Sequence, residues 1–173
     1  MRVSQEIEIT PTSVILNGQT LPLNDTGGRL LVELYRRFAG DYPKFFKMDT
    51  LCRLGFIAAE LLLKNGKADA VILANRSASL KNDNDYIATI SGSGYYPSPA
   101  LFVYTLPNIV TGEIAIRHHI TGETSFYILR DPSELEPLVL SAVSNRQSAV
   151  LAGWVECTGA DEFYAKMQII WNN

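Results

Sequence analysis

The chain has 173 residues, of which 47% are apolar and 19% are charged. A chain of this length can bury a sizeable core, and its composition is ordinary for a globular α/β protein. The net charge of −3, from 15 basic and 18 acidic residues, argues against the basic face that nucleic-acid binding usually needs. We therefore expect one domain over residues 1–173, with no nucleic-acid partner.

The chain shows no targeting, disulfide or metal-binding pattern. Its first residues lack the apolar region of a secretory leader, and no apolar run approaches the ~18 residues of a membrane span. Cys52 and Cys157 do not make a disulfide framework, and no Cys or His spacing is typical of a metal site. The expectation is a cytoplasmic protein with no membrane span, no metal and no other cofactor.

The N-terminal segment alternates between polar and apolar residues. Residues 5–23 contain the dipeptide Asn17-Gly18, a strong hairpin-turn signal, so they predict a small β-hairpin. Leucines at helical spacing then predict a helix over residues 28–38, which Gly40 ends.

The next segment predicts a helix followed by a buried strand. Asp49 is a good N-cap for a helix whose apolar residues run from Leu51 to Leu62, and Gly66 fits its C-cap. Residues 70–74 are a continuous apolar run, which is typical of a buried parallel strand. This order indicates a βαβ architecture.

Residues 75–98 are polar and rich in turn-forming residues, so they predict a long loop that is functional or packed by a neighbour. Within it, Gly92-Ser93-Gly94 lacks the lysine of a phosphate-binding loop and predicts a mobile segment. Two helical pieces follow, over residues 99–106 and 107–119, with Pro107 as the break between them.

The C-terminal third predicts strand, helix, strand, strand. Residues 126–129 and 149–155 are apolar runs typical of strands, and residues 163–171 predict a terminal strand. Between the first two, Asp131-Pro132-Ser133-Glu134 has the form of a helix start, with proline at the first helical position. The predicted helix continues to about residue 145.

Residues 98–122, SPALFVYTLPNIVTGEIAIRHHITG, resemble the segment that leads to the active-site cysteine of β-ketoacyl synthases. Residues 48–60, 70–80 and 151–156 resemble other parts of that family, in the same order. The resemblance implies a thiolase-like N-terminal half: a βαβαβ mixed sheet with helices, preceded here by the small N-terminal β-hairpin. The most similar members are ketosynthase-like and chain-length-factor-like proteins of aryl-polyene-type clusters.

In that family the nucleophilic cysteine stands nine residues after the glycine that matches Gly122, and here this position holds Asp131. A carboxylate cannot replace a thiolate as a nucleophile, so the resemblance implies a lost condensing activity. Two readings of Asp131 remain: a helix cap, which we favour, and a general base or mimic of an acidic intermediate.

Other residues offer weaker catalytic candidates. Cys52 or Cys157 would need a neighbouring base to serve as a relocated nucleophile, and buried unreactive cysteine is the default. His118 and His119 precede Gly122, where the family's helix ends, and the helix dipole favours a histidine there. The family's catalytic histidines belong to a C-terminal half that this chain does not show.

The resemblance also implies a partner. Members of the family pair along the strand that matches Phe126, Tyr127, Ile128 and Leu129. Four successive apolar residues on an unpaired edge strand would favour pairing with another chain. We expect a homodimer or a heterodimer with a full ketosynthase. The aromatic stretch from Tyr95 to Tyr104 lines an acyl tunnel, packs a partner or belongs to the core; for Phe102 we favour the core.

Three functions follow from these observations. The first is a non-catalytic scaffold or chain-length-factor-like partner in fatty acid or polyketide biosynthesis. The second is an acyltransferase or condensing enzyme that uses a relocated cysteine or residues of a partner chain. The third is an acyl-carrier-protein binding module whose Arg76, Lys81 and Arg117 meet the acidic carrier.

Overall fold

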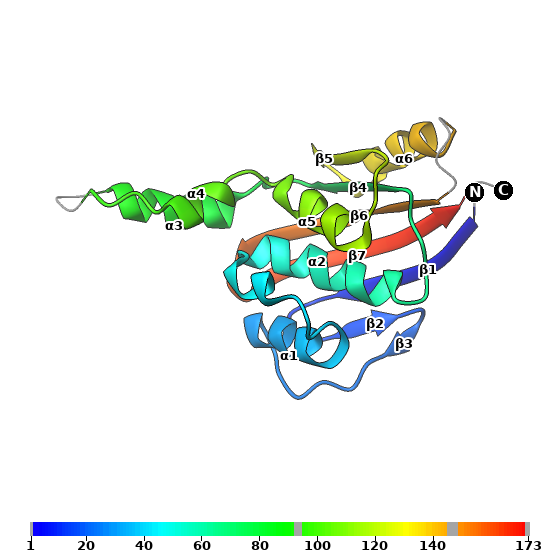
Figure 1. Ribbon diagram of the computed structural model, residues 1–173, viewed down its shortest axis with the longest axis horizontal. Helices are drawn as coiled ribbons and strands as arrows, with labels where there is room; N and C mark the ends of the chain where they lie inside the picture. Colours follow the sequence, from blue (N-terminus) through cyan, green and yellow to red (C-terminus); the bar gives the residue numbers. More distant parts are fainter. Residues whose placement is uncertain (1, 92–94, 145–148, 172–173) are drawn as a thin grey trace.

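The computed structural model describes residues 2–91, 95–144 and 149–171. Within them the chain forms one seven-stranded mixed sheet in the order β3-β2-β1-β7-β6-β4-β5 (Figure 1). Strands β4, β5 and β6 are parallel, whereas the remaining neighbours are antiparallel. The strands are β1 (Arg2–Ile9), β2 (Val14–Leu16), β3 (Gln19–Thr20), β4 (Ala70–Asn75), β5 (Thr124–Ile128), β6 (Ala149–Gly159) and β7 (Glu162–Trp171).

The helices divide unequally between the two faces of the sheet. Helices α1, α2 and α5 cover one face over the larger core, and α6 covers the other over a smaller core (Figure 1). Helices α3 and α4 project sideways beyond the sheet. The helices are α1 (Gly28–Phe38), α2 (Thr50–Leu63), α3 (Leu80–Ile90), α4 (Pro99–Val103), α5 (Ile109–His118) and α6 (Leu135–Ser144), with 3-10 turns η1 (Pro43–Lys47) and η2 (Pro132–Glu134).

The short-range signals in the N-terminal half are confirmed. Asn17 and Gly18 adopt φ angles of 50° and 78° and close the hairpin between β2 and β3, as a tight β-turn requires. Helix α1 has the predicted bounds, and Gly40 follows it at φ 67°. Asp49 caps α2, because its carboxylate accepts the Cys52 amide at 2.9 Å. The sheet extends the predicted hairpin, since β1 also pairs with β7.

The prediction that Gly66 caps α2 is wrong. The helix ends at Leu63, and Lys64 is its C-cap. Glycine at position 66 instead allows close packing, because a Cβ there would lie 2.5 Å from Ile169 Cδ1 and 2.9 Å from the Leu62 carbonyl oxygen.

The predicted βαβ order is confirmed by the parallel pairing of β4 with both β5 and β6. All six residues of β4 are buried, as expected for a strand covered on both faces. The break at Pro107 separates α4 from α5. Residues 132–134 form the 3-10 turn η2, after which α6 runs to Ser144; the predicted end at residue 145 lies outside the described residues.

The prediction of one long loop over residues 75–98 is wrong, because residues 80–90 form α3. The run from Asn82 to Asp85 is typical of a turn, yet Asn82 is buried and its amide donates to the Leu101 carbonyl at 2.7 Å. Long-range packing here overrides local preference. The loop predicted at residues 92–94 lies outside the described residues.

No helix among the described residues has both the length and the apolar character needed to cross a bilayer.

Candidate functional site

The connections after β4 and β5 leave the sheet on opposite faces. From β4 the chain passes through α3 and α4 to α5, on the face of the larger core, whereas from β5 it enters α6, on the other face. Open α/β sheets bind ligands outside the carboxyl ends of strands at such a switch point. The Leu129 amide donates to the Asn75 carbonyl at 2.9 Å, which joins the two connections. The candidate site is therefore this carboxyl edge of the sheet.

Asp131 lies at this edge, at the start of η2. Its carboxylate accepts the Ser133 amide at 2.9 Å, and its side chain is exposed. Hydrogen bonds from the hydroxyl and the amide of Ser133 hold the pKa of Asp131 below its ordinary value. An exposed carboxylate of lowered pKa is a helix cap and a poor general base.

Glu156 of β6 binds the loop after the neighbouring strand β4 through hydrogen bonds. It accepts the Arg76 amide at 2.9 Å and also accepts the Ser77 hydroxyl. Inside the loop, Asn75 exchanges hydrogen bonds with the backbone of Ala78, at 2.8 Å and 2.9 Å. This role of Glu156 was not predicted from the sequence. The available signal was its position, as a carboxylate directly after the apolar run of β6.

A groove runs from η2 along α6. It encloses about 570 Å³, which is in the size range of small-molecule sites. Trp154, Ile170 and Val139 give it apolar walls, while Lys166 and Gln168 lie at its polar side. Beyond the groove, the same sheet face carries Glu6 and Glu8 on β1, in register with Gln168 and Lys166. The part of this face that α6 leaves uncovered, over β1 and β7, therefore carries these four polar or charged side chains.

Both cysteines are buried in the larger core, on the face of the sheet opposite to α6. Cys52 and Cys157 are each only 2% exposed. Burial raises the pKa of the Cys52 thiol well above its ordinary value and that of Cys157 to about 12. Because the thiolate is the nucleophile, two neutral buried thiols have little reactivity at neutral pH.

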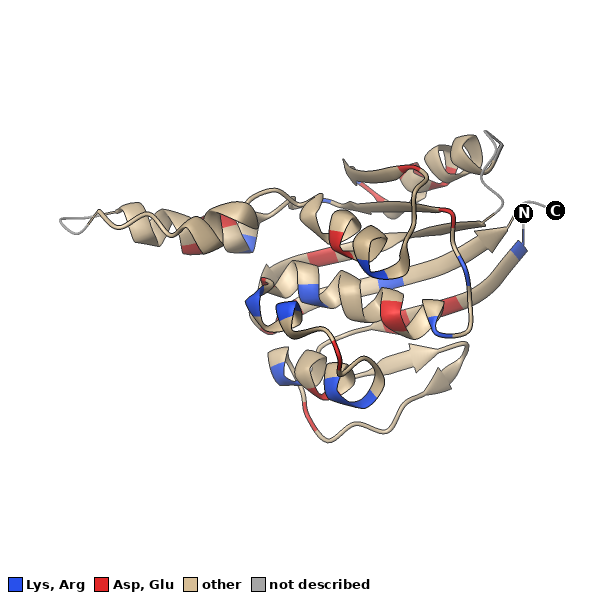
Figure 2. Ribbon diagram, in the orientation of Figure 1, with Lys and Arg blue, Asp and Glu red and all other residues tan. Residues whose placement is uncertain are grey.

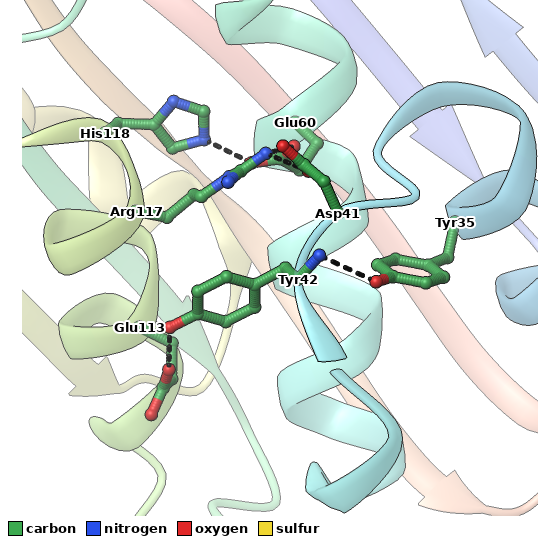
Figure 3. Close-up of polar contacts among 7 residues, drawn as sticks. All are labelled: Tyr35, Asp41, Tyr42, Glu60, Glu113, Arg117 and His118. Carbon is green, nitrogen blue, oxygen red and sulfur yellow. Dashed lines mark hydrogen bonds and ion pairs between the residues drawn. The ribbon is translucent and has the colours of Figure 1, made fainter. Parts of the chain in front are cut away.

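His118 belongs to a polar network between α2 and α5 (Figure 3). Glu60 accepts the Arg117 guanidinium at 3.0 Å and lies 2.8 Å from His118 Nε2. Arg117 also contacts Asp41 at 2.5 Å. His119 is the exposed C-cap of α5, at φ 55°. The network joins two helices to the loop before η1, so it stabilises packing far from Asp131.

A second buried carboxylate, Glu113, extends this network. The Tyr42 hydroxyl donates to it at 2.9 Å, and Lys44 forms an ion pair with it. The Tyr35 hydroxyl in turn accepts the Tyr42 amide at 2.8 Å (Figure 3). Sequence reasoning missed both buried glutamates. Among the described residues, no group of three or more His, Cys, Asp or Glu side chains is placed to hold a metal ion.

Asp49 should make stability fall as pH rises. Burial raises its pKa from 3.8 to about 6, so the folded chain holds the proton more tightly than the unfolded chain. Its contribution is present below pH 3.8 and is lost as pH rises through about 6. Relative to wild type, Asp49→Asn should gain about 2 kcal/mol of unfolding free energy between pH 4.5 and pH 7.5. Urea denaturation at both pH values measures this.

Asparagine caps helices about as well as aspartate, so the variant retains the cap and removes only the charge. An equal difference between variant and wild type at both pH values would contradict the raised pKa.

Two of the three basic residues expected to meet an acidic carrier have partners within the chain. Arg117 pairs with Glu60 and Asp41, and Lys81 pairs with Asp85. Among the described residues, no ion pair involves Arg76. The three cations therefore do not form one free basic patch.

The predicted edge strand is the outermost strand of the sheet, beside β4. Ile128 is 52% exposed, whereas Phe126 packs against the larger core and Tyr127 and Leu129 against the smaller one. The side chains of this edge are thus mostly engaged within the chain. The prediction that Phe102 belongs to the core is wrong, because it is 56% exposed.

No family model matches the sequence, and no curated protein matches it. The fold is similar to a chain in the solved structure of the ketosynthase ApeO in complex with its chain length factor ApeC from Xenorhabdus doucetiae. The TM-score is 0.73 at 12% identity, and the match covers 99% of this chain and 79% of that chain. The likeness shows the fold: a mixed α/β, thiolase-like fold of the ketosynthase type, as the sequence predicts.

Proposed function

We propose that residues 1–173 form a single-domain, chain-length-factor-like protein that pairs with a ketosynthase and does not catalyse condensation itself. The pathway would be fatty acid or polyketide biosynthesis of the aryl-polyene type. Two points support the pairing: the sequence resemblance at residues 98–122, and the likeness of fold to a chain from a complex of a ketosynthase with its chain length factor.

The observation that carries the proposal is the chemistry at Asp131. Acyl transfer by a condensing enzyme needs a thiolate, which a helix N-terminus and a nearby base stabilise. At this helix start the chain has an exposed carboxylate with a lowered pKa. Both thiols are buried in the larger core on the other face of the sheet. His118 is the last residue of α5, and His119 is its C-cap. Neither thiol therefore lies on the face of the sheet that α6 covers, where Asp131 precedes that helix.

Acyl transfer to the chain is expected to be absent. Incubation with a malonyl- or acyl-loaded carrier protein should leave the intact mass of the wild type, Cys52→Ala and Cys157→Ala unchanged, because neither thiol ionises near neutral pH. Mass spectrometry measures the added acyl group. A shift that one alanine variant abolishes would identify a relocated nucleophile and favour the acyltransferase function instead.

Pairing is tested with the ketosynthases of the same organism, each expressed with and without this chain. A stable complex, together with a changed length of the ketosynthase product, is the expected result. If no complex forms and the ketosynthase product is unchanged, the proposed function is wrong.

A further inference from the structure

Helices α3 and α4 and the described residues beside them, 80–91 and 95–106, form an arm that projects from the carboxyl edge of the sheet (Figure 1). The arm has almost no interior of its own. Asn82 is the buried residue of α3, and no residue of α4 is buried. Apolar side chains on such an arm have few neighbours within the chain.

Polar contacts hold the arm in shape. The Asn82 amide donates to the Leu101 carbonyl at 2.7 Å and links α3 to α4. At the base, the Ser79 hydroxyl donates to the Thr105 carbonyl at 2.7 Å. The rings of Tyr86 and Phe102 lie 5.5 Å apart, between their centres. The arm therefore folds back on itself without burying most of its apolar side chains.

Seven of the twelve exposed large apolar side chains of the described residues lie on the arm. They are Leu80, Ile87, Tyr95, Tyr96, Phe102, Val103 and Leu106. Three of them are aromatic, and an aromatic side chain buries about 150–250 Å² in a fully packed contact. A standard protein interface takes about 800 Å² from each partner. The exposed apolar side chains of the arm thus supply a large part of the area that such an interface takes from one partner.

The arm is also nearly free of charge. Residues 86–112 contain no Lys, Arg, His, Asp or Glu, and in Figure 2 the charged residues of the arm lie on α3 alone. Lys81 is already paired with Asp85. A membrane surface or an acidic carrier would require basic residues here. Aromatic enrichment with depleted charge is instead typical of the core of a protein–protein interface.

The arm exposes more large apolar side chains than the edge strand β5 does, so it is the better docking surface. On β5 one large apolar side chain, Ile128, is exposed, and its neighbours pack inside the chain. The match to a chain of the ketosynthase and chain length factor complex spans 99% of this chain, so it includes most or all of the arm. A chain of this overall shape therefore occurs within a complex of two proteins.

We infer that the arm, rather than β5, is the main docking element through which this chain binds its ketosynthase partner; this inference rests on the proposed function. The arm would enter an uncharged apolar cleft of the partner, with Ile87, Tyr96 and Phe102 as its buried anchors. Such anchors provide most of the binding free energy of an interface.

Three matched substitutions test this inference on the full chain: Ile87→Glu on the arm, Ile128→Glu on β5 and Ile116→Glu on α5. The wild-type side chains are 52%, 52% and 64% exposed, so each glutamate can reach water in the free chain. Circular dichroism melting checks that each variant folds. Affinity for the purified ketosynthase that binds wild type is measured by calorimetry, and sedimentation of each variant alone reports self-association.

The expected result is that Ile87→Glu weakens ketosynthase binding at least tenfold, whereas the other two variants bind within about twofold of wild type. Undiminished binding by Ile87→Glu, or a loss confined to Ile128→Glu, would overturn the inference and leave the proposed function intact. If Ile87→Glu instead abolishes a homodimer and leaves ketosynthase binding unchanged, the arm binds a second copy and the inference is wrong. If wild type binds no ketosynthase, the proposed function itself fails.

Discussion

Replacement of Gly153 by alanine is expected to lower the free energy of unfolding by about 3 kcal/mol or more. Gly153 lies in the middle of β6, in register with Met167 of β7. An added Cβ would lie 2.4 Å from the Lys166 carbonyl oxygen and 2.6 Å from Met167 Cα. These are backbone atoms of a hydrogen-bonded ladder, so they cannot move aside without loss of strand pairing. Urea denaturation followed by the fluorescence of the chain's two tryptophans measures the loss.

Gly112→Ala is the matched control for this methyl group. Gly112 lies within α5, and an added Cβ there would meet no atom within 4 Å. Alanine is the better helix former by about 1 kcal/mol, so this variant should be as stable as wild type or more stable. If Gly153→Ala and Gly112→Ala unfold at the same urea concentration, the close approach of β6 and β7 is incorrect.

The parts of the fold that the sequence predicts correctly rest on signals within a few residues. Asn17-Gly18 specifies a turn, Asp49 caps the helix that follows it, and Pro107 ends one helix before another begins. The apolar run of β4 is equally local, because a strand covered on both faces needs apolar residues at every position. The resemblance at residues 98–122 then supplies the architecture, which local signals alone do not determine.

The parts that escape prediction depend on residues far apart in the sequence. Helix α3 forms although its polar run favours a turn, because Asn82 bonds to Leu101 across the arm. Phe102 is exposed because the arm projects from the body of the fold. The residues next to Phe102 in the sequence carry no signal of this projection. Glu60 and Glu156 have partners 57 and 80 residues away, respectively. A single sequence shows such carboxylates as ordinary surface residues.

Glu60→Ala is expected to lower the free energy of unfolding by about 2–3 kcal/mol at neutral pH. Glu60 is buried on α2, while Arg117 and His118 approach it from α5. Loss of one partner of a buried pair typically costs about 3–5 kcal/mol, because the other charge stays buried and unpaired. We expect the lower figure, since Arg117 is partly exposed and keeps its contact with Asp41.

Denaturation across a pH range separates this charge pairing from loss of packing. Burial alone would raise the pKa of Glu60, but hydrogen bonds from His118 and Arg117 outweigh it, and the net pKa lies below the ordinary 4.5. A lowered pKa contributes stability above pH 4.5 that is lost as pH falls through the folded-state value. The difference between wild type and Glu60→Ala should therefore shrink in acid. A difference that is constant across this range would mean that Glu60 contributes packing alone.

Arg29→Ala is the control, because it removes a solvent-exposed ion pair on the protein surface. The Arg29 and Asp25 side chains are 83% and 41% exposed, and exposed pairs contribute about 0–1 kcal/mol. A double-mutant cycle between Glu60→Ala and Arg117→Ala should give a coupling energy larger than the whole effect of Arg29→Ala, because burial removes the solvent screening of the Glu60 pair. If the two effects are instead equal, helices α2 and α5 associate through their apolar contacts and the close packing at Gly55 against Val110, and the network adds only specificity.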